Sequence, residues 1–180
     1  METLMLKRNK ALMFAGGLWV FPGGALEDSD IESAEGDIAL AARIAAAREA
    51  EEECGLRPDT DNMVHLSHWT TPVVEPKRFE TWIYAAPLAE DADVAIDGSE
   101  IHDFAWIRVH DAVAQHEAGE FGMLPPTYIT LLSLLRYTTT ADMAAGENEI
   151  PPPYVFPVFT KAEGKMVVLF QGDAGYETGD

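Results

Sequence analysis

One acidic stretch, residues 47–56, constrains this chain more than any other feature of its sequence. It ends an alanine-rich run with the composition of a helix, and Gly55 is a typical helix stop. Residues three and four apart on a helix share a face, so Glu49, Glu52 and Glu53 project together. Three such carboxylates repel one another unless a positive charge lies between them. Hard divalent cations prefer oxygen ligands, so this pattern favours a metal site.

An acidic run also has a simpler interpretation, a helix face exposed to solvent. Glutamate is a good helix former, and for the glutamates alone this interpretation is the more common one. The surrounding residues favour a functional motif instead. From Arg48 to Leu56 the chain reads Arg-Glu-apolar-x-Glu-Glu-x-Gly-apolar, and upstream Phe21-Pro22-Gly23-Gly24 ends a short apolar run. A chance match to the second half of this pattern has odds on the order of 10^-5 to 10^-4.

The composition excludes several classes of function. The chain has 180 residues and 47% hydrophobic content, enough for one globular domain with a core. Its 12 basic and 31 acidic residues give a formal net charge of −19, which disfavours nucleic acid as a partner. A phosphate substrate would therefore need a cation or a locally basic pocket. The single Cys54 excludes an intramolecular disulfide and a multi-cysteine metal site.

The sequence lacks signals for membranes or export. No apolar run approaches the length of a membrane span, and residues 1–20 lack the arrangement of a signal peptide. We therefore predict no membrane partner and a cytoplasmic location.

The sequence predicts both strands and helices along the chain. The predicted strands lie at residues 3–8, 18–21, 63–69, 78–86, 101–109, 154–159 and 166–170. The predicted helices lie at residues 38–54, 111–118 and 125–137. Asp37 is a fair N-cap for the first helix, and the strands at 63–69 and 78–86 are expected to form a hairpin. Residues 27–36 are acidic and aperiodic, and we expect a loop insertion there.

The glycine loop and the glutamate helix together resemble the signature of the Nudix hydrolases, G-x5-E-x7-R-E-U-x-E-E-x-G-U, where U is apolar. Three further segments resemble the subgroup of the mammalian peroxisomal coenzyme A diphosphatase with an enlarged Nudix motif, and its bacterial relatives. These segments are residues 19–24, 69–72 with 76–81, and 124–127. The resemblance implies an α/β fold, the α/β/α sandwich around a mixed β-sheet, as one domain over residues 1–180. The motif from Gly24 to Leu56 would form a loop, a helix and a loop.

The resemblance also implies an enzyme that cleaves a diphosphate linked to another moiety, with Mg²⁺ or Mn²⁺ as cofactor. It implies that Glu49, Glu52 and Glu53 are metal ligands, one of them a candidate general base, with the Gly23 carbonyl as a further ligand. Arg48 would orient Glu49 and reduce the repulsion among the carboxylates. An ordinary helix salt bridge is the alternative role for Arg48.

A general base from another loop is common in this superfamily. Glu100, just before the strand at 101–109, is our first candidate and Glu80 the second, although either could be an ordinary surface residue. Four basic residues are notable in so acidic a chain and could meet phosphate or only protect solubility. They are Lys7, Arg8, Lys77 and Arg78.

Two departures from the family pattern bear on the site. The spacing from Gly24 to Arg48 is ten residues longer than the pattern, so the first-half glutamate would fall at Leu40. Glu27 or Glu35 could replace that glutamate only if the insertion folds back. The family also usually has an extra leading strand, which leaves two expectations: a chain that begins further upstream, or an edge covered by a second subunit in a homodimer.

The substrate class implied is a small nucleoside diphosphate. The subgroup favours coenzyme A or acyl-CoA, cleaved to 3′,5′-ADP and (acyl-)phosphopantetheine. The upstream motif of many CoA-directed relatives is only partly present, because Gly16 fits but Leu12 occupies its arginine position. ADP-ribose, a nucleoside-diphosphate sugar or a dinucleotide is the alternative substrate. A catalytically silent Nudix domain that binds a nucleotide or a protein is the alternative of another class.

Overall fold

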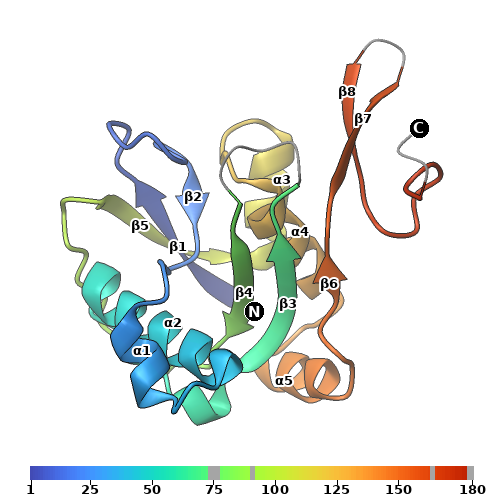
Figure 1. Cartoon of the computed structure of the whole chain (residues 1–180). Helices are drawn as coiled ribbons and strands as arrows, with labels where there is room; N and C mark the ends of the chain where they lie inside the picture. Colours follow the sequence, from blue (N-terminus) through green and yellow to red (C-terminus); the bar gives the residue numbers. More distant parts are fainter. Residues whose placement is uncertain (73–77, 90–91, 163–164, 178–180) are drawn as a thin grey trace.

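The computed structural model describes residues 1–72, 78–89, 92–162 and 165–177 (Figure 1). The first of its sheets is antiparallel and has β1 (Glu2–Arg8) between β2 (Trp19–Val20) and β5 (Ile101–Arg108). The second is mixed: β3 (Val64–Thr70) pairs antiparallel with β4 (Glu80–Ala85) and parallel with β6 (Tyr154–Val155). A separate hairpin, β7 (Val158–Ala162) and β8 (Lys165–Leu169), projects from the body near the C-terminus (Figure 1).

The helices come in two groups along the chain, one between β2 and β3 and the other between β5 and β6. They are α1 (Asp28–Ser33), α2 (Ile38–Cys54), α3 (Val109–Glu117), α4 (Pro125–Leu134) and α5 (Thr140–Asn148), with a 3₁₀ turn at Thr60–Asn62. The predicted α/β class is confirmed, as are the β3–β4 hairpin and the bounds of α2. Helix α5 was not predicted, because its residues are mostly small or polar with little apolar periodicity. Its N-cap is Thr139, whose hydroxyl accepts a hydrogen bond from the Asp142 amide at 3.1 Å.

The sheet built on β1 is covered by helices on both faces. Leu4 and Leu6 are buried on one face, and Met5 between them is buried on the other, as alternation along a strand requires. The first face packs against α2 in a cluster of Leu4, Leu6, Ala50, Cys54, Leu56 and Ile101. The second packs against α3 and α4 in a cluster that includes Met5, Val113 and Leu131. Sequence alternation in β1 therefore produces the sandwich that carries α2.

Helix α2 is fixed at both ends by local signals. The Asp37 carboxylate accepts hydrogen bonds from the amides of Ala39 at 2.9 Å and Leu40 at 3.1 Å, so the predicted N-cap is confirmed. Gly55 ends the helix in the left-handed conformation with φ 73°, where a residue with a Cβ would be strained. Cys54, at the last turn, is fully buried, and its thiol donates to the Ala50 carbonyl at 3.0 Å.

The insertion at residues 27–36 is not a loop, contrary to the prediction. It contains α1, which lies beside α2 (Figure 1). Glu27 and Asp30 form a capping box, in which the Glu27 amide donates to Asp30 Oδ2 at 2.9 Å. A helix of six residues is too short to show an apolar period, so the sequence pattern could not reveal it.

None of the helices in the described part of the chain is long and apolar enough to cross a membrane.

Candidate active site

Arg48 lies at the centre of the site and joins the insertion, the glycine loop and the glutamates. Its Nε and Nη2 donate to the two oxygens of the Asp30 carboxylate at 3.2 and 3.0 Å, a bidentate pair. Nη2 also donates to the Ala25 carbonyl at 2.9 Å. Nη1 donates to Glu49 Oε1 at 2.9 Å and lies 3.4 Å from Glu52 Oε1. Arg48 therefore does more than the ordinary i, i+4 helix pair that was its alternative role.

Asp30 is the carboxylate that the sequence analysis missed. It is only 3% exposed, and the Arg48 guanidinium holds the pKa of this carboxyl below its usual value. The expectation that position 40 corresponds to the first-half glutamate is wrong, since Leu40 lies exposed near the start of α2. Counting back from Arg48 with the seven intervening residues of the pattern reaches Leu40, whereas skipping the five residues after Gly24 reaches Asp30. The forward count was the available signal, because the extra residues lie between Asp30 and Arg48.

The insertion does fold back, as a replacement carboxylate would require. Glu27 reaches Arg48 only at 4.0 Å and with a largely exposed side chain, so it is a weak partner. Among the ion pairs of the described residues, Glu35 has none with Arg48. Asp30, rather than either glutamate, supplies the support.

Glu49 packs against the backbone of the glycine loop. A Cβ built on Gly24 would lie 2.3 Å from Glu49 Oε1, far inside any real contact. The loop can approach α2 this closely only with glycine at this position. Gly24 and the hydrogen bond from Arg48 together fix the Glu49 carboxylate.

Glu53 is a buried carboxylate with little positive charge beside it. It is 7% exposed, and its Oε2 accepts a hydrogen bond from the Gly23 amide at 2.9 Å. Arg8 Nη1 lies 3.9 Å from Oε1, too far for a hydrogen bond. Burial raises the pKa of Glu53 to about 7, and repulsion from Glu49 adds to this effect. The Gly23 contact seen here uses the amide, and its carbonyl as a metal ligand stays a prediction.

The remaining predicted residues lie in different places. Glu52 is exposed on the surface side of the cluster. Glu100 lies beside the site, where its Oε2 accepts a hydrogen bond from Arg8 Nη2 at 3.4 Å. Glu80 lies elsewhere, on β4, 3.8 Å from His68 Nε2. Of the two candidate bases, the fold brings only Glu100 to the glutamates.

Of the four notable basic residues, Lys7 and Arg78 do not meet the glutamates in the described structure. Lys7 lies over the ring of Trp19, 5.2 Å from its centroid. Arg78 is exposed, and Lys77 is outside the described residues. Arg8, the last residue of β1, is the one of the four that lies at the site in the described structure.

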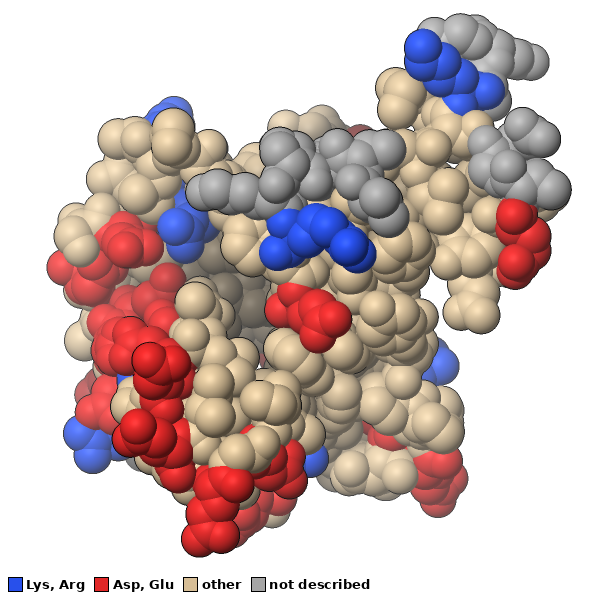
Figure 2. Space-filling view, viewed as in Figure 1, with Lys and Arg blue, Asp and Glu red and all other residues tan. Residues whose placement is uncertain are grey.

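The surface around the site is acidic. In Figure 2, Asp and Glu side chains gather at the lower left, over the α1 and α2 region of Figure 1. The charge of −19 is therefore concentrated partly where an anionic substrate would have to approach. A bound cation would offset this repulsion.

No group of three or more His, Cys, Asp or Glu side chains in the described residues is placed to hold a metal ion. The reason is visible in the hydrogen bonds: Glu49 faces Arg48, whereas Glu53 faces the Gly23 amide. The donor chemistry nevertheless fits a hard cation. Glu53 is a buried carboxylate whose pKa is raised by burial and by Glu49, so positive charge beside these two carboxylates would relieve both effects.

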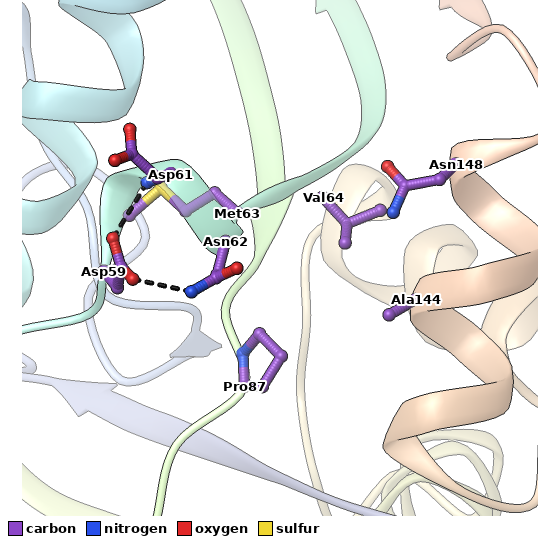
Figure 3. Close-up of a pocket in the computed structure, with 8 residues that line it drawn as sticks. All are labelled: Asp59, Asp61, Asn62, Met63, Val64, Pro87, Ala144 and Asn148. Atoms are coloured by element: carbon purple, nitrogen blue, oxygen red, sulfur yellow. Dashed lines mark hydrogen bonds between the residues drawn. The ribbon is translucent and has the colours of Figure 1, made fainter.

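Two cavities lie outside the carboxylate cluster. One of about 680 Å³ borders it, with Phe21, Pro22, Ala46 and Ala50 in its wall. The other, of about 430 Å³, lies between the 3₁₀ turn and α5 (Figure 3). Asp59 in this second cavity already accepts hydrogen bonds from the Asp61 amide and the Asn62 side chain. None of the predicted site residues lines the second cavity.

Comparison with known proteins agrees with this architecture. The model of the NUDIX domain family matches residues 1–127. A Caenorhabditis elegans protein assigned the name nudix hydrolase 7 is 25% identical over 211 residues, covering 97% of this chain and 70% of that protein.

Solved structures share the fold. A NUDIX hydrolase from Alicyclobacillus acidocaldarius superposes with a TM-score of 0.71 and 22% identity, covering 80% of this chain and 87% of the other. The MutT protein from Methanosarcina mazei Go1 superposes with a TM-score of 0.53 and 19% identity, covering 83% of this chain and 86% of the other. With the family match over most of the chain, the chain belongs to the Nudix hydrolases and is a pyrophosphohydrolase of that family.

Proposed function

We propose that this enzyme hydrolyses the diphosphate linkage of a nucleotide derivative with Mg²⁺ or Mn²⁺, and that coenzyme A or an acyl-CoA is its favoured substrate. The observation that carries the reaction class is the Arg48 network, which holds Glu49 against the glycine loop beside the buried Glu53. Nudix hydrolases generally use divalent metals, and these carboxylates have the matching donor chemistry.

Each residue of the site has a distinct proposed role. Glu49 and Glu53 would hold the cation, with the exposed Glu52 and the Gly23 carbonyl as further ligands. A bound cation neutralises diphosphate charge and lowers the pKa of water. Arg48 is a positioning residue, because it fixes Glu49 through a hydrogen bond of 2.9 Å.

Glu100 is the proposed general base. It stands at the edge of the site on the segment before β5, and its carboxylate is exposed to the solvent from which the attacking water would come. The alternative base is one of the helix glutamates. A pH–rate profile of Glu100→Gln distinguishes them, because removal of the true base suppresses the limb that reports its ionisation.

Support for coenzyme A comes from the subgroup resemblance. The enlarged spacing between Gly24 and Arg48 and the segments at 19–24 and 124–127 are the features concerned. Cleavage would release 3′,5′-ADP and phosphopantetheine, or its acylated form.

A substrate panel tests this function. The purified protein is incubated with coenzyme A, an acyl-CoA, ADP-ribose, a nucleoside-diphosphate sugar and a dinucleotide, with Mg²⁺, Mn²⁺ or a chelator. We expect metal-dependent turnover with the highest kcat/KM for coenzyme A or the acyl-CoA. A higher kcat/KM for another compound of the panel would contradict the assignment of coenzyme A as substrate. If no compound is turned over, the protein is better described as a catalytically silent binding domain.

The control for the glutamates comes from the same helix. We expect Glu49→Gln to lose at least 10²-fold in kcat/KM, whereas Glu51→Gln should retain activity, since Glu51 pairs with Arg57 away from the site. Equal losses in both variants would contradict the assigned site.

The homodimer, the cytoplasmic location and the single domain over residues 1–180 stay predictions. Light scattering of the purified protein tests the first of them.

A further inference from the structure

Arg8 is placed unusually for an arginine at the end of a strand. Its side chain is only 18% exposed, although it lies at the last position of β1. The register between β1 and β5 shifts between Lys7 and Arg8, which marks an irregularity in the ladder at this point. Such bulges re-aim a side chain and occur next to active sites. Here the side chain is directed between Glu53 and Glu100.

The guanidinium of Arg8 is under-satisfied in this position. It has five N–H donors, yet its Nε is buried without a hydrogen-bond partner among the described residues. Nη2 makes a long hydrogen bond of 3.4 Å to Glu100, and Nη1 is 3.9 Å from Glu53. A buried donor without an acceptor is costly, so this arrangement is complete only with another acceptor.

Arg8 is not needed to hold this part of the fold together, because other hydrogen bonds already do so. The end of β1 is already tied to the Glu100 segment by backbone and amide groups of Asn9. The Asn9 amide donates to the Glu100 carbonyl at 2.7 Å, and its side chain donates to the Ser99 carbonyl at 3.1 Å. The segment is also held by Asp97, which accepts from the Glu100 and Ile101 amides at 2.9 Å. The long Arg8–Glu100 contact adds little to these bonds.

We infer that Arg8 binds a phosphate oxygen of the substrate diphosphate, which takes the place of Glu100 as its partner. This inference rests on the proposed function and extends it to the recognition of the phosphates. A guanidinium presents two parallel N–H donors that match the oxygens of a phosphate. Arg8 is also the described cation nearest to Glu53, in a region otherwise dominated by carboxylates.

The inference makes the substrate phosphate and the Glu100 carboxylate competitors for the Arg8 guanidinium. The substrate phosphate pulls Arg8 away from Glu100, which frees the Glu100 carboxylate for its proposed role when substrate is present. Removal of the arginine should therefore weaken phosphate binding, whereas removal of the Glu100 charge should strengthen it. A role in folding alone would not produce these opposite signs.

The test measures ADP binding by calorimetry in the presence of Mg²⁺, because ADP carries a diphosphate and binding is read without turnover. We expect Arg8→Ala and Arg8→Lys to weaken ADP binding by about tenfold to a hundredfold, the value of one or two charge-assisted hydrogen bonds. We expect Glu100→Gln to tighten it. Arg57→Ala is the control, since Arg57 is exposed and pairs only with Glu51 among the described ion pairs.

The outcomes separate this inference from the proposed function. ADP binding that is unchanged in Arg8→Lys, a variant that keeps the charge and the fold, overturns the role of Arg8, as does a loss of affinity in Glu100→Gln. Absence of turnover by the wild type contradicts the proposed function but leaves the binding series as a separate measurement. Wild-type protein that binds no ADP overturns the inference about Arg8.

Discussion

At residue 30, one carboxylate holds the insertion against helix α2. Asp30 accepts two hydrogen bonds from Arg48 and one from the Glu27 amide, all from within a buried position. An aspartate has a shorter side chain than the glutamate of the family pattern. Helix α1 compensates for that difference, because it brings the backbone of residue 30 close to Arg48.

Replacement of this carboxylate should change both stability and its pH dependence. We expect Asp30→Asn to lower the free energy of unfolding by about 2 kcal/mol at neutral pH, since it removes charge-assisted hydrogen bonds from a buried pair. The pKa of Asp30 is lowered from 3.8, so its contribution is present above pH 3.8 and is lost as the pH falls through the native pKa.

Denaturant unfolding at several pH values measures this difference. The difference in free energy of unfolding between the wild type and Asp30→Asn should become smaller below pH 3.8. Glu32→Gln, on the exposed side of the same helix, should behave as the wild type does. A difference in the free energy of unfolding that stays constant down to strongly acidic pH would show that folding does not lower the pKa of Asp30.

Gly24 is the second residue on which the geometry of the site depends, because there is no room for a Cβ at this position. A methyl group there would displace the Glu49 carboxylate, and we expect Gly24→Ala to reduce kcat/KM by about 10²-fold. Stability should change little, because the displaced atoms are the end of a flexible side chain. In the Gly24→Ala background, Glu49→Asp should cost little more, since the first change has already misplaced the carboxylate. Fully additive losses would contradict the contact.

At the scale of elements, α2 is defined by its own ends. Asp37 satisfies two of the free amides in the first turn. We expect Asp37→Ala to lower the free energy of unfolding by about 1 kcal/mol. The kcat of the folded fraction should not change, because Glu49 lies three turns away. Thermal unfolding and a steady-state assay below the transition measure the two effects, and a loss of kcat without a loss of stability would contradict this separation.

At the scale of the whole molecule, the metal should stabilise the fold. A ligand that binds only the folded state at about 100 times its Kd adds about 2.7 kcal/mol, so Mn²⁺ should raise the unfolding temperature of the wild type. The rise should be much smaller in Glu53→Gln and should disappear with a chelator. Glu51→Gln again serves as the control. An equal rise in the Glu53 and Glu51 variants would show that the ions bind the acidic surface rather than the site.

The β1 strand connects parts of the molecule that lie far apart in the chain. Because β1 pairs with β5 along its length, Arg8 meets Glu100 across 92 residues of sequence. Because α2 packs on the same sheet, Arg8 lies 3.9 Å from Glu53, and the charge of Glu100 is near enough to help raise the pKa of Glu53. The arrangement of the candidate base, the candidate phosphate-binding residue and the buried carboxylate is therefore a property of the sheet.

The sequence by itself determined the helix that carries the glutamates and the glycines that face it. Asp37, Gly55 and the spacing of Glu49, Glu52 and Glu53 act over a few residues, so their consequences can be read from local order. The position of Asp30 could also be predicted from the motif spacing, by counting forward from Gly24.

Only the tertiary structure decided which charges meet. The insertion forms a helix because its capping box closes and it packs on α2, neither of which leaves a periodic pattern. Glu100 rather than Glu80 lies at the site because β5, not β4, pairs with β1. Strand pairing depends on packing across the whole chain, and contacts between residues that are distant in sequence leave no mark in local spacing.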